Sequence, residues 1–320
     1  MIEGDYMSIT KAQIRVKELE LEILKLNELN TKEAEDKVVL LEQEKQKIIE
    51  DNFKKLSSYD RVTLARQRER PNIYQYIQEI FDSFIEMHGD RLGMDDRAIV
   101  GGLAYFKNQP VTVIGHLKGK NTKENIECNF GMAHPEGYRK AIRLMKQADK
   151  FNRPIITFID TSGAYPGDKA EEKGQGEAIA RSLYEMSLLS VPVIAIVIGE
   201  GGSGGALALS VANSIAMLEN AVYSVLSPEG FASILWKDAT RAQEASEIME
   251  LTAKDLYRKK IIDTIIEEPL GGIQQNPTEV MMRVTYFIDK KLKELCAMKK
   301  EELKKQRYLK FRKLGNLINE

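Results

Sequence analysis

The sequence predicts an α/β fold in which helices connect mostly parallel strands. From residue 154 onward, an apolar strand pattern, a loop of small residues and a helix pattern follow one another three times, with strands expected at 155–160, 191–198 and 221–226. Uninterrupted apolar runs of this kind are typical of strands buried on both faces. Because such alternation implies right-handed crossovers, the loops after the strands should gather at one edge of the sheet, where α/β proteins bind ligands.

Composition narrows the possible functions. The 320 residues include 47 Lys and Arg and 48 Asp and Glu, a balance that argues against a nucleic-acid-binding protein. Cys128 and Cys296 form neither a disulfide framework nor a clustered zinc site, so no metal is expected. We expect a reduced, cytoplasmic protein. The highly charged start of the chain and the lack of a long apolar run predict neither a signal peptide nor a membrane span.

The first part of the chain has the pattern of two helices. Apolar residues repeat at helical spacing within 8–56 on both sides of Asn30 and Thr31, where the chain is expected to turn. Thr31 can cap the second helix. The pair could clasp the main domain, or it could contact a second copy or another subunit.

The next segment predicts a helix, a hairpin and a second helix. The apolar stripe over 73–85 favours one helix, and 98–106 and 111–117 favour two strands joined by a short turn. Pro135 begins a helix that is expected to extend to Lys150. Its basic face could be solvated or could meet a phosphorylated ligand, and it carries Arg139, Arg143 and Lys146.

After each later strand the sequence predicts a loop and a helix. One helix should follow 161–167 and reach about residue 189, and another should start at Ser227 and Pro228 and reach Trp236. Thr252 and Asp255 form a capping-box pattern before a short helix and a strand at 261–266. A final long helix begins near Asn276 and becomes basic after Leu295, where a solvated face is expected. We therefore divide the chain into an N-terminal helical extension (1–60), a core (61–275) and a C-terminal helix with a basic tail (276–320).

The functional signal is strongest in residues 191–218. A buried strand is followed by five closely spaced glycines and then by small residues that predict a helix over 206–217; the glycines are Gly199, Gly201, Gly202, Gly204 and Gly205. Glycine allows the backbone to approach a ligand closely. A helix that begins at such a loop points unpaired N–H groups at whatever binds there. The segment therefore predicts an anion site made of backbone groups.

Three other motifs overlap this region and are disfavoured. Gly199, Gly201 and Gly204 match the glycine spacing of the dinucleotide-binding fingerprint. That fingerprint also needs an acidic residue at the end of the next strand, whereas Glu219 lies before the next strand begins. Ser203 lies in a nucleophile-elbow pattern, yet all three histidines precede it, whereas hydrolases with this elbow place the histidine later. Gly119 and Lys120 lack the rest of a phosphate-binding loop. The remaining hypothesis is an oxyanion site of fixed N–H donors, with tight helix–strand packing as the structural alternative.

With these residues in view, the chain closely resembles the α-subunit family of bacterial acetyl-CoA carboxylase carboxyltransferase. The resemblance rests on seven blocks that occur in the family's order: HGDR (88–91), AIVGG (98–102), NFGMAHPEGYRKA (129–141), PIITFIDTSGAYPG (154–167), GEGGSGGALAL (199–209), YSVLSPEGFASILWKD (223–238) and EPLGGI (268–273). It implies a crotonase/ClpP-like spiral of ββα units with an N-terminal helical extension and a long C-terminal helix. Ser162 and Gly176 depart from the family's usual proline and serine.

The resemblance also implies a reaction and a site. The family transfers CO₂ from carboxybiotin, held on a biotin carboxyl carrier protein, to acetyl-CoA, which gives malonyl-CoA for fatty acid synthesis. The implied oxyanion hole for biotin is the backbone of Gly204, Gly205 and Ala206, and the implied second donor turn is Gly163 and Ala164. The residues expected beside the cofactor are Gly201, Gly202, Tyr165 and Pro166.

The implied partners are a β subunit in an α₂β₂ arrangement, the carrier protein, and biotin carboxylase in the larger complex. Zinc is expected in the β subunit and not in this chain. Two alternatives stay open at this point. One is a stand-alone crotonase-like hydratase or isomerase, with Glu171, Glu172 or Glu177 as its carboxylate base. The other is a non-catalytic assembly subunit that works through its terminal helices.

Overall fold

The computed structural model describes residues 8–29 and 31–315. Within them, an eight-stranded sheet has the order β1-β2-β3-β4-β5-β6-β8, and β7 pairs with β5. The first three strands are antiparallel, and the others are parallel from β3 onward. The strands are β1 (Asp82–Glu86), β2 (Ile99–Phe106), β3 (Gln109–His116), β4 (Ile155–Thr161), β5 (Val193–Gly202), β6 (Ser214–Leu218), β7 (Val222–Ser224) and β8 (Thr264–Ile266). The predicted α/β architecture with parallel central strands is confirmed.

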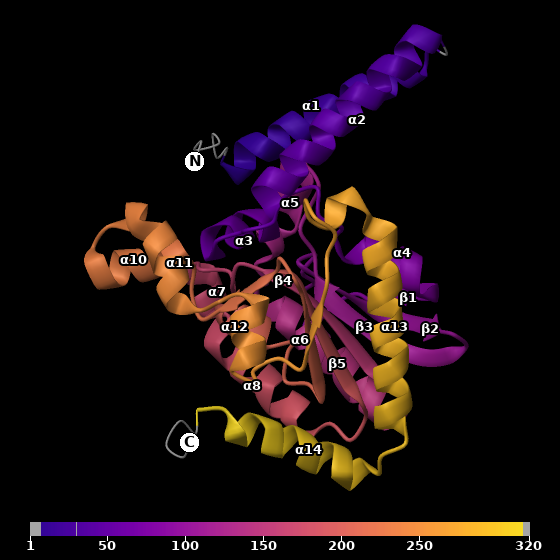
Figure 1. The fold of residues 1–320 in the computed structure, drawn as a ribbon. Helices are drawn as coiled ribbons and strands as arrows, with labels where there is room; N and C mark the ends of the chain where they lie inside the picture. The colour runs from indigo at the N-terminus through magenta and orange to yellow at the C-terminus, as the bar shows by residue number, and fades with distance from the viewer. Residues whose placement is uncertain (1–7, 30, 316–320) are drawn as a thin grey trace.

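Helices surround this sheet (Figure 1). In chain order they are α1 (Ile9–Asn27), α2 (Lys32–Phe53), α3 (Ser58–Ala65), α4 (Ile73–Ile80), α5 (Thr122–Glu127), α6 (Pro135–Lys150), α7 (Asp168–Glu172), α8 (Gln175–Leu188), α9 (Ser203–Leu207), α10 (Pro228–Trp236), α11 (Ala242–Met249), α12 (Ala253–Arg258), α13 (Pro277–Cys296) and α14 (Lys300–Lys313). Short 3₁₀ turns lie at Asn129–Gly131, Ala239–Arg241 and Ile273–Gln275.

Two glycines show that helices cover both faces of the sheet. A Cβ on Gly101 would lie 2.5 Å from Leu144 of α6, and a Cβ on Gly115 would lie 2.8 Å from Ile73 of α4. Gly115 pairs with Val100, the neighbour of Gly101, so the two glycines face opposite sides of the sheet. Helices α4 and α6 therefore pack closely on opposite faces.

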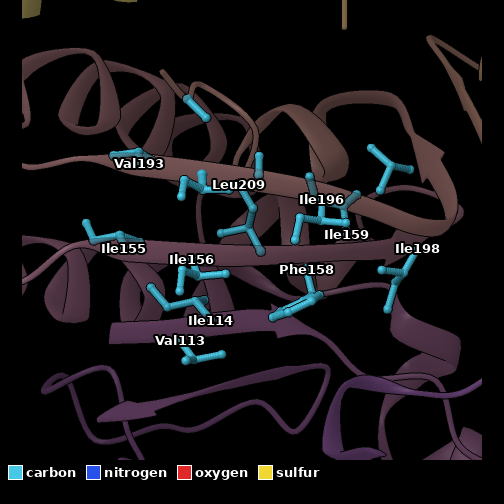
Figure 2. Packing of buried hydrophobic residues seen from close by; sticks show 14 of the residues in the cluster. Val113, Ile114, Ile155, Ile156, Phe158, Ile159, Val193, Ile196, Ile198 and Leu209 are labelled. Atoms are coloured by element: carbon cyan, nitrogen blue, oxygen red, sulfur yellow. The ribbon is translucent and has the colours of Figure 1, made fainter. Parts of the chain in front are cut away.

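The interior is formed by the central parallel strands. Ile155, Ile156 and Phe158 of β4 pack beside Val193 and Ile196 of β5, and all five are fully buried (Figure 2). Such continuous apolar strands are typical of a sheet covered on both faces. They hold the carboxyl ends of β4 and β5 rigidly side by side.

The hairpin and several helices form where the local sequence signals predict them. Strands β2 and β3 are joined by Lys107 and Asn108, which both have positive φ (47° and 65°), as a tight primed turn requires. Thr31 caps α2, and α6 spans the predicted range from Pro135 to Lys150. Asn30, at the expected turn between α1 and α2, lies outside the described residues.

The helix expected over 206–217 is wrong. Helix α9 ends at Leu207, and the buried residues 214–218 form strand β6 between β5 and β8. Because β6 is buried on both faces, its sequence carries no alternation that would distinguish a strand from a buried helix. The first three of the five glycines expected in a loop instead belong to β5, which continues through Gly199, Gly201 and Gly202.

The helix expected over 73–85 is shorter than predicted. Helix α4 ends at Ile80, Phe81 is extended, and Phe84 and Ile85 belong to β1 at the sheet edge. Phe81 packs on Phe106 and Phe158, so burial of its ring coincides with the change from helix to strand. Similarly, the single helix expected up to residue 189 is divided at Gly174, which has a φ of +82°.

The single C-terminal helix is in fact two helices, α13 and α14. They are separated at Lys299, whose backbone N–H donates to the Glu302 carboxylate and so begins a new helix. The expected solvated basic face is also wrong in one respect, because Arg307 of α14 is 1% exposed. Its guanidinium donates to the carbonyls of Met186, Leu189 and Val191 and to Asn213 Oδ1, which lie between 2.6 and 3.0 Å away. Arg307 therefore connects α14 to the segment that leads into β5.

The N-terminal helices α1 and α2 pack on each other and project from the rest of the chain (Figure 1). At the base of the pair, Val16 and Phe53 form a cluster with Leu64 of α3. Lys17 also forms an exposed ion pair of 3.0 Å with Glu69. The pair contacts the rest of the chain at its base, and its role, as a clasp on the main domain or as a contact for a second copy or another subunit, stays a prediction.

Candidate active site

The glycine segment joins β5 to the short helix α9. Strand β5 ends at Gly202, and Ser203 then has a φ of +52° as the chain turns into the helix. The N–H groups of Ser203, Gly204 and Gly205 occupy the first positions of α9, where no intrahelical acceptor exists. Ala206 is the first residue whose N–H can reach a carbonyl of the same helix. The turn therefore presents backbone donors at the carboxyl end of the sheet.

The second predicted turn lies directly against this segment. A Cβ on Gly205 would lie 2.7 Å from the Gly163 carbonyl carbon and 2.9 Å from Ala164 N. A Cβ on Gly202 would lie 2.1 Å from the Ser162 oxygen. Glycine is required at both positions because of this close backbone approach. The structure thus brings Gly163 and Ala164 together with Gly204, Gly205 and Ala206.

Hydrogen bonds within the second turn determine which of its donors stays available. The Gly163 N–H donates to Thr161 Oγ1 over 3.1 Å, and the same hydroxyl donates to the Gly163 carbonyl over 2.7 Å. Within the described residues we find no hydrogen bond from the Ala164 N–H. Of the two predicted residues, Ala164 therefore has the available donor.

The residues predicted beside the cofactor lie at different depths. Gly202 contacts the turn, whereas a Cβ on Gly201 would lie 2.8 Å from the Tyr223 ring, so Gly201 serves packing. Tyr165 is half-buried, and its ring stacks on that of His134 at 4.1 Å between centroids. Gln175 donates to the Tyr165 carbonyl over 3.0 Å. Pro166 is exposed beside them.

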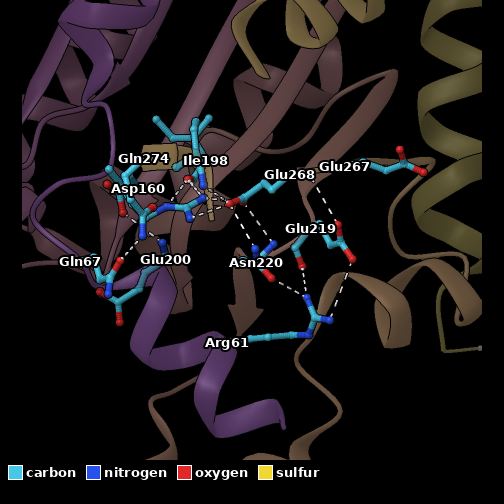
Figure 3. Close-up of polar contacts among 12 residues, drawn as sticks. Arg61, Gln67, Asp160, Ile198, Glu200, Glu219, Asn220, Glu267, Glu268 and Gln274 are labelled. Atoms are coloured by element: carbon cyan, nitrogen blue, oxygen red, sulfur yellow. Dashed lines mark hydrogen bonds and ion pairs between the residues drawn. The ribbon is translucent and has the colours of Figure 1, made fainter. Parts of the chain in front are cut away.

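A group of buried charges that sequence reasoning missed lies beside these turns. Lys118 Nζ lies 2.9 Å from Asp160 and 2.7 Å from Glu200, and Glu200 is also 2.7 Å from Arg66. Figure 3 shows Asp160 and Glu200 close together, near Glu268 and Asn220. The missed signal is that Lys118, Asp160 and Glu200 all lie at the carboxyl ends of adjacent strands. They could have been predicted to meet there.

Opposite charges nearby keep Lys118 and Glu200 ionised despite their burial. Burial alone would lower the pKa of Lys118, but Asp160 and Glu200 raise it overall. Burial alone would raise the pKa of Glu200, but Lys118 and Arg66 lower it overall. The Glu200 backbone N–H also donates to Asp160 over 3.0 Å. Since Asp160 and Glu200 adjoin the two turns in sequence, the charges tie both turns to the sheet.

Acid is expected to destabilise the fold through His116. Burial, with the nearby charge of Lys118, lowers the pKa of this fully buried imidazole from 6.5 to about 3. The unfolded chain therefore binds a proton at this histidine that the folded chain does not bind. As a result, the free energy of unfolding decreases as the pH falls from 6.5 towards 3. We expect a loss of about 2 kcal/mol between roughly pH 7.5 and pH 5. Urea unfolding at the two pH values measures this loss in the free energy of unfolding. The His116→Phe variant should lose less stability than the natural chain over the same range. Equal losses in the variant and the natural chain would contradict this account.

Comparison with known proteins identifies the family. A family model described as acetyl co-enzyme A carboxylase carboxyltransferase-like matches residues 9–315. The chain belongs to this carboxyltransferase family. Curated relatives named acetyl-coenzyme A carboxylase carboxyl transferase subunit alpha include one from Alkaliphilus oremlandii, which is 53% identical over 94% of this chain and 96% of its own length. Another, from Listeria monocytogenes, is 53% identical over 97% of both chains. The resemblance inferred from the seven sequence blocks is confirmed.

Solved carboxyltransferase and decarboxylase structures share the fold. Transcarboxylase 12S has a TM-score of 0.55 at 19% identity, over 69% of this chain and 42% of its own. The Pseudomonas malonate decarboxylase MdcD-MdcE hetero-dimer has a TM-score of 0.55 at 16% identity, over 69% of this chain and 89% of its own. These neighbours confirm the expected crotonase type of fold for this carboxyltransferase family member.

Other features of this carboxyltransferase family member bear on three further questions: a hydratase activity, a metal site and a membrane-spanning helix. Glu171, Glu172 and Glu177 are all exposed, and the first two lie on α7 while the third lies on α8, so the single carboxylate-bearing helix of the hydratase hypothesis does not form. Among the described residues, no three His, Cys, Asp or Glu side chains gather as metal ligands. Within 8–29 and 31–315, no helix has both the length and the apolar character needed to span a bilayer.

Proposed function

We propose that this chain is the α-type half of a heteromeric acetyl-CoA carboxylase carboxyltransferase. With a β subunit, it would transfer CO₂ from carboxybiotin to acetyl-CoA and produce malonyl-CoA for fatty acid biosynthesis. The proposal is supported by family membership over residues 9–315 and by relatives that carry the α-subunit name over nearly their whole length. The stand-alone hydratase and the non-catalytic subunit have no comparable support.

One observation supports the catalytic role most directly. Gly202 and Gly205 lie against residues 162–164 so closely that any Cβ would fill the space between the two turns. The resulting cradle, formed by residues 162–164 and 202–206, presents backbone donors that a planar ureido group could approach. Such donors are oriented before charge develops, which makes an oxyanion site effective.

Each residue of the cradle then has a role. We assign the donors for the biotin ureido oxygen to the N–H groups of Gly204 and Gly205, because Ala206 N–H has an intrahelical acceptor within reach. Ala164 N–H is assigned as the second donor, since Gly163 N–H is bonded to Thr161. Tyr165 and Pro166 would border the ring of the cofactor, and Gly201 and Gly202 would hold the cradle's shape.

The chemistry that carboxybiotin supplies, when bound, is release of CO₂ with negative charge left on its ureido oxygen. The N–H groups of Gly204 and Gly205 would stabilise that charge, and each such donor typically contributes about 3 kcal/mol. The charged group of Lys118, Asp160 and Glu200 would keep the two turns at fixed separation. No serine nucleophile is needed in this arrangement.

The proposed assembly contains further proteins. The β subunit would supply the site for the acetyl-CoA thioester and would carry the zinc, and an α₂β₂ complex is the arrangement that the family implies. The carrier protein would present the biotin, and biotin carboxylase would recharge it. We place the enzyme in the cytoplasm, in keeping with two free cysteines, Cys128 and Cys296.

Reconstitution tests the proposal. Malonyl-CoA formation from acetyl-CoA and carboxybiotin is measured with this chain alone, with the β subunit alone and with both subunits together. We expect turnover only when both are present. Turnover by this chain alone would overturn the proposal in favour of a stand-alone enzyme. Turnover by the β subunit alone would reduce this chain to an assembly role.

A further inference from the structure

A buried threonine beside the cradle bonds to both backbone groups of one turn residue. Thr161 is the last residue of β4, and its side chain is fully buried. Its hydroxyl donates to the Gly163 carbonyl over 2.7 Å and accepts from the Gly163 N–H over 3.1 Å. Within residues 8–29 and 31–315, we find no other hydrogen bond to either backbone group of Gly163. One hydroxyl therefore satisfies both polar groups of this buried glycine.

The bond to the Gly163 carbonyl sets the direction of the neighbouring donor. This carbonyl and the Ala164 N–H belong to one planar trans peptide, in which they point in opposite directions. Because the carbonyl points at the Thr161 hydroxyl, the Ala164 N–H points away from the buried end of β4. The same peptide faces Gly205, since a Cβ there would lie 2.9 Å from Ala164 N. The contact from Thr161 therefore keeps the Ala164 donor on the side of the cradle.

The backbone of the turn does not hold this direction by itself. Gly163 has a φ of +152° and no Cβ, so it tolerates rotation of the peptide that follows it. Such a rotation would exchange the positions of the carbonyl and the N–H and would turn the Ala164 donor inward. The next contact along the chain comes after this peptide, where the Tyr165 N–H donates to the Ala133 carbonyl over 3.1 Å. A side chain that holds the Gly163 carbonyl is therefore needed.

We propose that Thr161 is a positioning residue whose hydroxyl directs the Ala164 N–H into the cradle. It acts through the peptide between Gly163 and Ala164 and touches no substrate. Branching at Cβ restricts the χ1 angle of threonine, so the direction of the hydroxyl is itself fixed. This inference rests on the proposed function of the cradle and adds to it the residue that orients its second donor.

The test uses the complex with the β subunit and compares three variants of this chain. Thr161→Val keeps the size and the branching of the side chain and removes the hydroxyl, whereas Thr161→Ser keeps the hydroxyl. Thr157→Val is the matched control, because Thr157 is another fully buried threonine of β4. Its hydroxyl also donates to a backbone carbonyl, that of Leu209, over 2.7 Å. Both valine variants lose a comparable buried hydrogen bond, but only the bond of Thr161 reaches the turn.

We expect Thr161→Val to lower kcat about ten- to hundredfold, somewhat less than the loss of a whole oxyanion donor. The KM for acetyl-CoA should change less than about twofold, because Thr161 touches no part of that substrate. Thr161→Ser should recover most of kcat. Thr157→Val should keep the kcat of the natural chain, although Tm should fall in both valine variants. Rates are taken per assembled complex, and Thr161→Ala replaces the valine variant if that one does not assemble.

Three results would overturn the inference. They are an unchanged kcat for the assembled Thr161→Val complex, a serine variant as impaired as the valine variant, and equal losses of kcat in Thr161→Val and Thr157→Val, which a purely structural role predicts. Gly205→Val in the same assay separates the two proposals. If the Gly205→Val complex is inactive while Thr161→Val is fully active, the cradle stands and the role of Thr161 fails; if both are fully active, the cradle itself fails.

Discussion

Replacement of Gly205 by valine is expected to abolish carboxyl transfer by the assembled complex. The new Cβ would lie 2.7 to 3.0 Å from backbone atoms of Gly163 and Ala164, which belong to a turn fixed by Thr161. Those atoms cannot rotate away as a side chain would, so the two turns must separate. Loss of the aligned donors should lower kcat by at least about 10²–10³-fold. Malonyl-CoA formation at saturating acetyl-CoA measures the effect.

Two other glycines provide controls for this substitution. A Cβ on Gly176 meets nothing within 4 Å, so Gly176→Ala should leave activity unchanged. A Cβ on Gly204 would meet only the Ile179 side chain, at 3.2 Å, so Gly204→Ala should cost less than Gly205→Ala. Full activity of the Gly205→Val complex would refute the catalytic role of the cradle and leave this chain as a scaffold.

Replacement of Arg70 by methionine is expected to cause the largest loss of stability from a single side chain. Arg70 and Glu268 form a buried ion pair with N–O distances of 2.8 and 3.1 Å and side-chain exposures of 2% and 0%. Arg70 also donates to the Ile198 carbonyl, on the strand that leads to the glycines. Without Arg70, the Glu268 carboxylate stays buried without its counter-ion, which typically costs about 3–5 kcal/mol. The loss is measured by urea unfolding.

The exposed pair of Lys17 and Glu69 is the matched control. Its side chains are 63% and 52% exposed, so Lys17→Met should change the free energy of unfolding by less than about 1 kcal/mol. Replacing both Arg70 and Glu268 by methionine should recover part of the loss, since no buried charge is then left unpaired. If Arg70→Met is no more destabilising than Lys17→Met, the buried pair does not stabilise the fold.

Local signals in the sequence were sufficient for some elements. Each of these signals determines the structure of residues that are its neighbours in the sequence. They are the turn at Lys107 and Asn108, the proline at the start of α6, and the helix caps at Thr31 and Ser227. The contact between the two turns was expected because the family resemblance placed Gly163 and Gly205 in one site. These parts of the fold and of the site were therefore predictable.

Other parts depend on contacts between segments distant in sequence. Strand β6 looked like a helix because burial on both faces removed any alternation. Arg307 looked solvated because its partners lie more than ninety residues earlier in the chain. None of these relations has a signal within the segment concerned.

The position of Arg307 has a consequence for how the protein is made. The carbonyls of Met186, Leu189 and Val191 emerge from the ribosome long before the arginine that binds them. Until α14 has been synthesised, these three carbonyls lack the guanidinium that binds them, although the first residues of β5 are already paired with β4. The segment that leads into β5 therefore gains its last hydrogen bonds only near the end of translation, and a nascent chain arrested before residue 307 would expose these carbonyls and be a target for chaperones and proteases.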